Sequence, residues 1–346
     1  MSAIMSLSSL YGQTYLSQDF EAAWVGNNPS APGAGSIPAG QNWTQNRTQL
    51  VNNGTPRALT DGSGGLDVDW VTSTWDANLN RWSSFSYTAG NFGPAGAPIG
   101  AASGNSAMMI DDGNWGGLQS SRRVESPTIN LTTSTSPYLR FAFHYPVTNT
   151  NTNFRAVIST DGGTTWRVLS QIISGGEFQG AMSSGSPWQR IAIPIHSSLR
   201  TANVKVAFEA VGTYGAQSIF VDAVTVQEFT PVTITSAGSG YWSSPSTWVG
   251  GVAPTCENNV VIAAGHRVTY DYNMTRAQNI TVAGTLTGNN AISTAMQIFG
   301  DLTVNSGGLY NSFCANGLAA VRTYLGGNLV NNGTVDLSRS AGLLAW

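Results

Sequence analysis

Charged side chains are scarce in this sequence. Lysine, arginine, aspartate and glutamate make up 10% of the 346 residues, and the formal net charge is −3. No block of lysine and arginine occurs, so we expect neither a nucleic-acid partner nor an anionic membrane surface. No apolar run is long enough for a transmembrane segment. A sustained 3.6-residue apolar period is also missing, which excludes a mainly helical fold.

Cysteine and histidine are equally few, which limits the chemistry that the chain can perform. Cys256 and Cys314 match no metal-binding spacing, and we favour two buried thiols over a disulfide. The acids of the C-terminal third are widely spaced, whereas glycosidases and polysaccharide lyases need clustered acids. No triad spacing connects an acid or a nucleophile to any of the three histidines, His144, His196 and His266. We therefore predict that the protein is not an enzyme.

Glycine and strand-forming residues are abundant instead. The chain has 40 glycines, and aromatic residues make up 10% of it. This composition is typical of many short strands joined by tight turns, so we expect an all-β protein. The length predicts about two domains.

The segment from Tyr138 to Val226 has the clearest strand pattern. Apolar residues take alternate positions in its first part, which is the period of a half-buried strand. A strand over 154–160, an Asp161-Gly162-Gly163 turn and a strand over 164–169 predict a β-hairpin. Three further strands are expected, over residues 188–195, 204–209 and 219–226.

The hairpin also carries a family resemblance. Ser159-Thr160-Asp161-Gly162-Gly163-Thr164-Thr165-Trp166 resembles the S-x-D-G-G-x-x-W hairpin of secreted bacterial adhesin-type jelly rolls. These are the cleaved-adhesin and choice-of-anchor J domains, which are related in shape to MAM domains and jelly-roll carbohydrate-binding modules. Asp19-Phe20-Glu21 before the hairpin and Ile219 to Val226 after it agree in order. The resemblance implies a jelly-roll β-sandwich over residues 14–230 and an extracellular or cell-surface location.

Residues 1–13 have two interpretations. Their small and apolar residues resemble the end of a bacterial secretory signal peptide that is cleaved near Gln13, although a basic n-region is missing. The alternative is an ordinary N-terminal arm that leads into the first strand.

The resemblance further implies a calcium site. Jelly rolls of this type hold a structural Ca²⁺ between their first and last strands, and the matching residues are Asp19 or Glu21 and Asp222. Two carboxylates fall short of the about six to eight oxygens that calcium needs, and Ala223 stands where the family has a second aspartate. The alternative is that Asp222 accepts turn hydrogen bonds and that Glu21 is solvated.

Five tryptophans form the candidate ligand-binding set. Sugars stack on exposed aromatic faces, and neighbouring asparagine and threonine can bond to their hydroxyls. The alternative is burial in the sandwich core, which is the more frequent fate of a single tryptophan. All five lie in the loop-rich stretches of the first 120 residues: Trp43, Trp70, Trp75, Trp82 and Trp115.

The pattern changes after Phe229. A linker is expected over residues 231–239 and a second domain over 240–346. Gly-x-Leu phrases recur there between Asn-Gly and Gly-Gly turns, which is typical of a right-handed parallel β-helix, or solenoid. The leucines Leu286, Leu302 and Leu329 are expected to stack as one inward ladder.

The start of this second domain carries its own resemblance. The segment from Gly240 to Pro254, with Trp242 and Trp248, resembles the opening of β-helix segments in very large secreted bacterial surface proteins. This resemblance implies that a Trp-rich cap covers the first coil.

These observations predict a secreted, non-catalytic adhesin or extracellular-matrix protein whose partner is a glycan or another cell-surface ligand. The alternative is the accessory carbohydrate-binding portion of a larger polysaccharide-degrading enzyme. The sequence pattern predicts that the coil ending at Trp346 is unfinished. We therefore expect either a fragment of a longer chain or self-association into a filament through the C-terminal β-helix.

Overall fold

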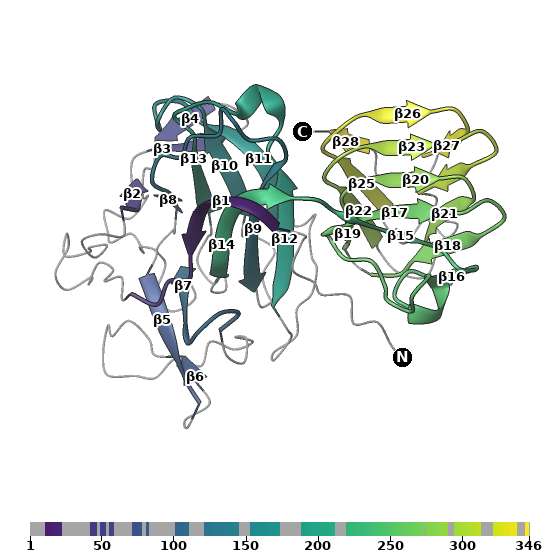
Figure 1. Cartoon of the computed structure of the whole chain (residues 1–346), viewed down its shortest axis with the longest axis horizontal. Helices are drawn as coiled ribbons and strands as arrows, with labels where there is room; N and C mark the ends of the chain where they lie inside the picture. Colours follow the sequence, from purple (N-terminus) through teal and green to yellow (C-terminus); the bar gives the residue numbers. More distant parts are fainter. Residues whose placement is uncertain are drawn as a thin grey trace. The chain divides into compact units, whose positions relative to one another are not determined.

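The chain folds into two compact units, Tyr11–Phe229 and Thr230–Trp346. The structure is a computed structural model (Figure 1). It describes residues 11–22, 42–46, 49–52, 55–58, 71–77, 81–82, 101–110, 121–144, 153–173, 188–211, 219–272, 274–289, 294–312, 321–337 and 343–345.

The first unit is a β-sandwich whose described strand pairs are all antiparallel. The seven-stranded sheet has the order β12 (Gln189–Pro194), β9 (Pro137–His144), β14 (Ile219–Phe229), β7 (Ser106–Ile110), β5 (Val71–Asp76) and β6 (Arg81–Trp82), and β1 (Tyr11–Gln18) also pairs with β14. The five-stranded sandwich sheet has the order β11 (Arg167–Ile173), β10 (Asn153–Ser159), β13 (Lys205–Val211), β8 (Ser121–Glu125) and β2 (Thr44–Asn46). The remaining elements of this unit are the β3 (Gln49–Asn52) and β4 (Thr55–Ala58) hairpin and the short 3-10 helix η1 (Ser197–Leu199).

Phenylalanine rings fill the space between these two sheets. The ring centroid of Phe141 on β9 lies 4.8 Å from that of Phe208 on β13 and 6.3 Å from that of Phe154 on β10. All three side chains are buried. Side chains at alternate positions of a strand point to the same face, so the period-two pattern of β9 places its phenylalanines inward. Each buried ring contributes about 1.5–3 kcal/mol, and this burial holds the sheets face to face.

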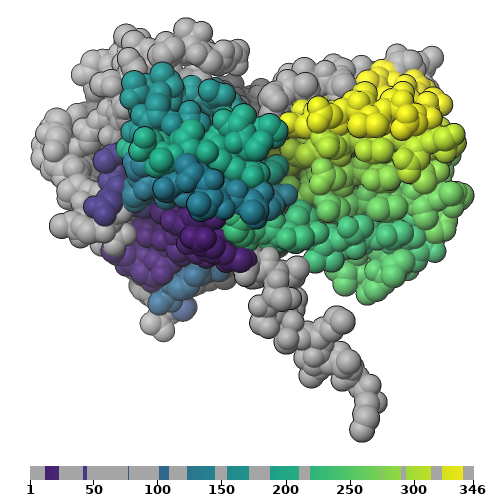
Figure 2. Space-filling model, turned by 45° about the horizontal axis from the view of Figure 1, so that its top comes forward, coloured from purple at the N-terminus to yellow at the C-terminus, as the bar shows by residue number. Residues whose placement is uncertain are grey.

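The second unit is a parallel β-solenoid of about four turns. Successive coils follow each other in sequence order, from green to yellow in Figure 2. One sheet has the order β15 (Val232–Thr235), β17 (Asn258–Ile262), β20 (Ile280–Val282), β23 (Leu302–Val304) and β26 (Leu329–Asn331). A second has the order β16 (Gly240–Tyr241), β18 (Arg267–Tyr270), β21 (Thr285–Gly288), β24 (Leu309–Asn311) and β27 (Thr334–Asp336). The third has the order β19 (Thr275–Ala277), β22 (Thr294–Ile298), β25 (Val321–Leu325) and β28 (Leu343–Ala345).

Residues 231–239, which we expected to be a linker, instead enter the first coil. Val232-Thr233-Ile234-Thr235 is β-branched throughout and favours a strand. It forms β15, which pairs in parallel with β17. The backbone of residues 247–249 covers the other edge of β15, because the Val249 N–H donates to Thr235 O at 2.9 Å.

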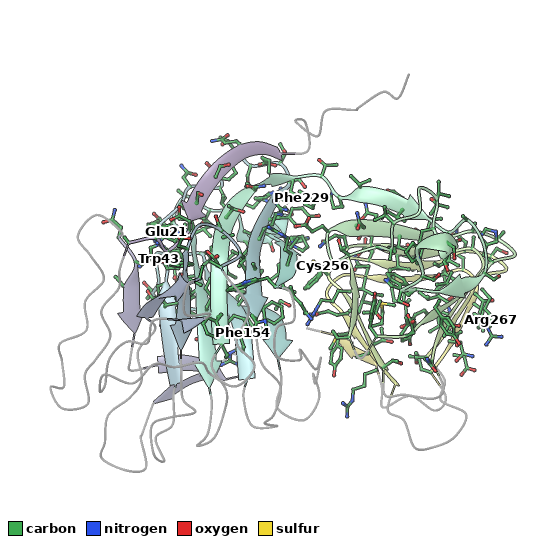
Figure 3. The ribbon with its side chains drawn as sticks, turned by 90° about the horizontal axis from the view of Figure 1, so that it is seen from below. Glu21, Trp43, Phe154, Phe229, Cys256 and Arg267 are labelled. Atoms are coloured by element: carbon green, nitrogen blue, oxygen red, sulfur yellow. The ribbon has the colours of Figure 1, made fainter. Side chains whose placement is uncertain are left out.

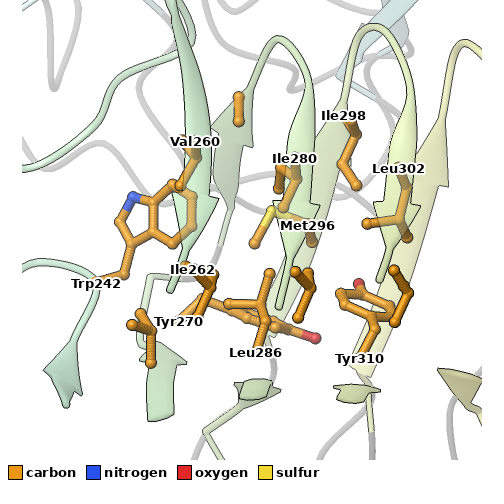
Figure 4. Close-up of a cluster of buried hydrophobic side chains, with 14 of the residues drawn as sticks. Trp242, Val260, Ile262, Tyr270, Ile280, Leu286, Met296, Ile298, Leu302 and Tyr310 are labelled. Atoms are coloured by element: carbon orange, nitrogen blue, oxygen red, sulfur yellow. The ribbon is translucent and has the colours of Figure 1, made fainter. Parts of the chain in front are cut away.

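The two tryptophans of the cap segment are buried beside this first coil. Trp242 and Trp248 lie edge to face, with ring centroids 5.1 Å apart, and both belong to the hydrophobic core of the solenoid. Figure 4 shows Trp242 in this core. Both indole N–H groups have partners: Trp248 Nε1 donates to Trp242 O at 2.8 Å, and Trp242 Nε1 donates to Pro254 O at 3.3 Å. The short 3-10 helix η2 (Pro245–Thr247) connects the two residues.

Inward side chains stack in columns from coil to coil (Figure 4). One column runs through Val260, Ile280 and Leu302. The predicted ladder is therefore wrong in one member, because Leu286 lies in a different sheet, where it pairs with Val268 and Tyr310. Leu329 does pair with Leu302 but is 40% exposed on β26.

Polar side chains near the start of successive coils form a ladder of hydrogen bonds, which we call the polar ladder. The Asn279 Nδ2 group donates to Asn259 Oδ1 at 2.8 Å, the Asp301 N–H donates to Asn279 Oδ1 at 2.7 Å, and the Asn328 N–H donates to Asp301 Oδ1 at 2.7 Å. The residue before Asp301 must be glycine, because a Cβ atom on Gly300 would lie 2.2 Å from Asn279 Oδ1. The polar ladder of the preceding coil thus explains the glycines at positions 300 and 327, where a Cβ atom would meet Asn279 Oδ1 and Asp301 Oδ1. At Gly284 the crowding atoms are instead the backbone oxygens of Ala263 and His266.

The predicted fold class, a jelly-roll sandwich followed by a β-solenoid, is confirmed. Residues 1–10 of the expected signal remnant lie outside the described residues, and Tyr11 to Gln13 belong to β1. Cys256 is buried, and Cys314 lies outside the described residues. None of the helices that the structure describes is long and apolar enough to cross a membrane.

Candidate metal and ligand-binding sites

The first candidate site lies where β14 changes its neighbour within the seven-stranded sheet. Residues 219–221 of β14 pair with β7, whereas Val224 to Phe229 pair with β1. Asp222 and Ala223 stand between these two pairings, and the register with β9 also shifts here. Ala223 adopts a left-handed backbone conformation with φ 50°. The pairing along this edge of β14 is therefore interrupted at Asp222, although Asp222 still pairs with β9. The interruption is filled by Glu21, which follows β1, and by backbone N–H groups of the loop before β7.

Glu21 and Asp222 hold that loop from two directions. Glu21 Oε1 accepts the backbone N–H groups of Asn105 at 2.9 Å and Ser106 at 2.8 Å. Asp222 Oδ2 accepts the N–H of Ser103 at 2.8 Å. Between these contacts, Gly104 has φ +60°, and a Cβ atom there would lie 2.3 Å from Glu21 Oε1.

The residue before Glu21 fixes the position of this carboxylate. Phe20 is buried and has φ 57°, a backbone conformation that is uncommon for a residue with a side chain. Its ring packs edge to face against Trp43, with centroids 5.9 Å apart, and Figure 3 shows Glu21 near Trp43. The anchored Phe20 turns the chain so that Glu21 reaches the loop.

The two carboxylates influence each other electrostatically. The pKa of Asp222 is raised to about 6, mainly by burial and in addition by the negative charge of Glu21, against backbone hydrogen bonds that lower it. A divalent cation between two such carboxylates would remove their repulsion. Asp19 is exposed and accepts the N–H of Glu21 at 3.4 Å, so it stands beside the pair. The described residues contain no group of three or more metal-ligating side chains, and backbone oxygens or water would have to complete a calcium shell.

The predicted tryptophans fall into three groups. Trp43 is 4% exposed and packs on Phe20, so it is a core residue and its ring is not available for sugar stacking. Trp75 and Trp82 are direct cross-strand partners in the β5–β6 hairpin. Trp70 and Trp115 lie outside the described residues.

The second candidate site is a chain of five ionic side chains that the sequence analysis missed. It lies on the face of the five-stranded sandwich sheet opposite to the phenylalanine core, because these residues alternate with inward ones such as Val124 and Phe208. Four contacts link the ion chain: Lys205 Nζ to Glu125 Oε2 at 3.5 Å, Arg123 Nε to Glu125 Oε1 at 2.9 Å, Arg123 Nη1 to Glu209 Oε1 at 3.2 Å and Arg155 Nε to Glu209 Oε2 at 2.7 Å. Strand register explains it, because Glu209 stands opposite Arg155 on β10 and Arg123 on β8.

The Ser159–Trp166 turn supplies a cover for this ion chain. Asp161 accepts the Thr165 N–H at 2.9 Å and the Thr165 hydroxyl at 2.6 Å, and Ser159 Oγ accepts the Gly163 N–H at 2.8 Å. These bonds extend the turn, so β11 begins at Arg167 rather than at the predicted residue 164. The turn carries Trp166 back over the sheet, where Arg123 Cζ lies 4.5 Å from the centroid of its ring.

A sequence signal for the ion chain existed. Arg123 and Glu125 are two residues apart in one strand, and Lys205 and Glu209 are four apart in another, so each pair shares a strand face. Lys205 is the only lysine of the sequence. In a chain with so few charges, alternation of charged and apolar residues in neighbouring strands predicts an ionic face.

The three histidines all have structural contacts, and the ring of His144 packs against Trp188 and Phe220. His196 Nδ1 accepts the N–H of Ser198 and so caps η1. His266 Nδ1 lies 2.8 Å from the hydroxyl of Ser236, which is itself buried and accepts the Ala263 N–H. A nucleophile needs access to its substrate, so the buried Ser236 does not fit that role.

Comparisons with known proteins give similarity only at the level of solved structures. No family model and no curated protein matches the sequence. The K2 cleaved adhesin domain of Lys-gingipain is 13% identical, with a TM-score of 0.36, over 61% of this chain and 98% of that chain. The K1 cleaved adhesin domain of Lys-gingipain from Porphyromonas gingivalis is 15% identical, with a TM-score of 0.36. The match covers 63% of this chain and 100% of that chain. The C-terminal family 22 carbohydrate-binding module of Clostridium thermocellum Xyn10B is 10% identical, with a TM-score of 0.30. The match covers 62% of this chain and 94% of that chain. These are the groups of domains that the hairpin motif resembles.

Proposed function

We propose that this chain is a non-catalytic extracellular protein of the adhesin type, and that its jelly roll binds glycans. The observation that carries the proposal is the pairing of Trp75 with Trp82 across the β5–β6 hairpin. Residues directly opposite each other in an antiparallel pair are neighbours on one face. Both positions carry tryptophan, the residue type whose aromatic face stacks well on sugar rings.

A glycan array probed with the full chain tests this proposal. Replacement of Trp75 and Trp82 together by alanine should weaken binding about tenfold or more, because each lost stacking contact is worth about 0.5–1.5 kcal/mol. Replacement of both by tyrosine keeps two rings and should retain part of the affinity. Tyr241→Ala is the matched control, since this aromatic side chain is 56% exposed on the solenoid. Absence of glycan binding, or binding that the double alanine variant leaves intact, would contradict the proposal.

We also propose a structural Ca²⁺ at Glu21 and Asp222, with Asp19 beside them. The pair fits a divalent cation because two hard, mutually repelling carboxylates converge there. A bound cation would stabilise the loop at residues 102–106, whose N–H groups these carboxylates already hold.

Self-association through the C-terminal β-helix stays a prediction. Residues 247–249 cover the edge of β15, so head-to-tail pairing through that edge would require displacement of the cap. β26 lies at the other edge of the same sheet, where Leu329 and Val330 are 40% and 44% exposed. Concentration-dependent light scattering that Leu329→Lys abolishes would support association through β26, and a monomer at all concentrations would exclude it.

A further inference from the structure

Among the residues that the structure describes, the ion chain contains three cations and two anions. Lys205, Arg123 and Arg155 are cationic, and Glu125 and Glu209 are anionic. Each carboxylate contacts two cations, and Arg123 contacts both carboxylates. The surplus positive charge therefore belongs to the two ends of the chain, Lys205 and Arg155.

Arg155 is the end that is built to accept an anion. Its Nε atom donates to Glu209 Oε2 at 2.7 Å, and Glu209 is fully buried and held from the other side by Arg123. This contact fixes the plane of the guanidinium group. Within the part of the chain that the structure describes, Nη1 and Nη2 of Arg155 make no hydrogen bond, and the side chain stays 12% exposed. Two parallel N–H donors in a fixed plane match the two oxygens of a carboxylate or a sulfate.

Lys205 is less suited to this role. Its ammonium group is 3.5 Å from Glu125 and lies on a flexible stem, which gives a point charge rather than a planar fork. Gly163 of the turn also stands over it, because a Cβ atom on Gly163 would be 3.4 Å from Lys205 Cδ. An anion would therefore be recognised more specifically at Arg155.

Stability alone does not explain the ion chain. Removal of charges from water costs free energy, and apolar residues of similar size often stabilise a protein as well or better. This sequence uses charged residues for only 10% of its positions, yet five of them meet on this one sheet face. The free-energy cost of burying these charges is understandable if the charged side chains orient a group that binds a ligand.

We propose that Arg155 is the centre of an anion-binding subsite that recognises the carboxylate or sulfate groups of an acidic polysaccharide. The proposal rests on the proposed function, because it names the class of glycan that the jelly roll takes. Glu209 and Arg123 act as positioning residues that hold Arg155.

Binding of the full chain to three immobilised polysaccharides tests this inference: polygalacturonate as the carboxylate source, dextran sulfate as the sulfate source and neutral dextran. Polygalacturonate or dextran sulfate should bind, and the affinity should fall as salt is added. Arg155→Gln should weaken this binding about tenfold or more, because a hydrogen bond to a charged group is worth about 1.5–3 kcal/mol. Arg155→Lys keeps the positive charge and loses the planar pair of donors, so it should weaken binding to the acidic polysaccharides, but less than Arg155→Gln does.

Arg167→Gln is the matched control. Arg167 is exposed on β11 of the same sheet and outside the ion chain, and its loss changes the net charge equally. It should leave binding within about twofold of the parent. A melting curve for each variant separates loss of binding from loss of folding, and Arg155→Lys replaces Arg155→Gln if the latter unfolds.

The outcomes separate the two proposals. Equal loss in Arg155→Gln and Arg167→Gln would overturn the subsite, because binding would then depend on net charge alone. Binding to neutral glycans that Arg155→Gln leaves unchanged would also overturn it and would leave the proposed function standing. If no polysaccharide binds, the full chain is titrated with galacturonate and with inorganic sulfate. Binding of either anion that depends on Arg155 would support the subsite without the glycan function. Absence of binding would contradict both the subsite and the glycan function.

Discussion

The indole ring of Trp166 lies over the guanidinium group of Arg123, with Arg123 Cζ 4.5 Å from the ring centroid. Arg123 lies on β8 and Trp166 ends the turn before β11, and the Asp161-centred hydrogen bonds of that turn bring the two residues together. The tryptophan at the end of the S-x-D-G-G-x-x-W motif thus has a physical role. It covers a cation in the middle of the ion chain, where a cation–π contact is stronger than at an exposed site.

This contact predicts the effect of Trp166→Ala. The free energy of unfolding of the jelly roll should fall by about 1–2 kcal/mol, which is the worth of a partly desolvated cation–π contact. Trp166→Tyr keeps a ring and should cost less. Urea denaturation followed by circular dichroism measures both variants. Equal losses in the two variants would mean that the ring face contributes nothing to the stability.

The hydrogen bonds of Glu228 should make the stability of the jelly roll depend on pH. Burial opposes ionisation of this carboxyl, but hydrogen bonds from Thr135, Tyr15 and Ser136 outweigh burial and hold the pKa of Glu228 below its ordinary value. A pKa that is lower in the folded than in the unfolded state means that the stabilisation is complete above the unfolded pKa of about 4.3 and is lost as the pH falls through the folded pKa.

Glu228→Gln should therefore lower stability at pH 7 and reduce the loss of stability on acidification below about pH 4.3. Denaturation midpoints at pH 7, 5, 4 and 3 measure this difference. Glu257→Gln, which removes the same charge from the solenoid, is the control. A constant gap between Glu228→Gln and the parent across this range would contradict the assignment.

Calcium should raise the melting temperature of the jelly roll if the Glu21–Asp222 pair binds it. A ligand that binds only the folded state stabilises it by mass action, so the shift should grow with the calcium concentration and vanish after chelation. Asp222→Asn and Glu21→Gln should abolish the response, and Asp19→Asn should diminish it less, because Asp19 is exposed. Without metal, Asp222→Asn should stabilise the protein at pH 7, since it removes a buried charge that lies near Glu21. No shift at millimolar calcium would exclude the site.

The fold could be predicted where periodicity decides the structure. The alternation of Leu139, Phe141 and Phe143 is a local property, and it places these side chains inward in β9. The Gly-x-Leu repeat predicted coils but misplaced Leu286, because similar triplets begin strands of two different sheets. Gly284-Thr285-Leu286 leads into β21, whereas Gly300-Asp301-Leu302 leads into β23. Only the register between coils distinguishes them, and register depends on contacts between distant residues.

The candidate sites were predictable only in part, for a similar reason. Glu21 and Asp222 were named from a resemblance, but the gap that joins them depends on β14 exchanging β1 for β7. The ion chain needs three strands in one register before Glu209 reaches both Arg155 and Arg123. Trp43 was misassigned because its burial depends on the left-handed turn at Phe20, and no sequence motif marks that conformation.

Gly300→Ala tests the polar ladder of the solenoid. The added Cβ atom would meet Asn279 Oδ1 at 2.2 Å, and overpacking of this kind costs about 1–3 kcal/mol. Hydrogen exchange of the amides in β20 and β23 should accelerate, because these strands flank the clash. Gly238→Ala is the control, since a Cβ atom there meets nothing within 4 Å. Similar exchange in both variants would show that the ladder can shift without cost.

Trp248→Ala tests whether the cap both stabilises and protects the first coil. The side chain is 2% exposed and packs against Trp242, and truncation of a buried tryptophan costs about 3–5 kcal/mol. The backbone of Trp248 also bridges to Ser236, and its neighbour Val249 donates to Thr235 at the edge of β15. Loss of the indole anchor should loosen residues 247–249 and expose that edge, and unpaired strand edges template association with other chains.

Two readouts follow for this variant. The melting temperature of the solenoid should fall, and light scattering below that temperature should rise with protein concentration. Thr235→Pro in the Trp248→Ala background is the discriminating variant, because proline blunts an exposed strand edge. If it restores a monomer without restoring the melting temperature, the association runs through β15. If scattering is unchanged, the aggregates form through another surface, and the cap stabilises the solenoid without protecting its edge.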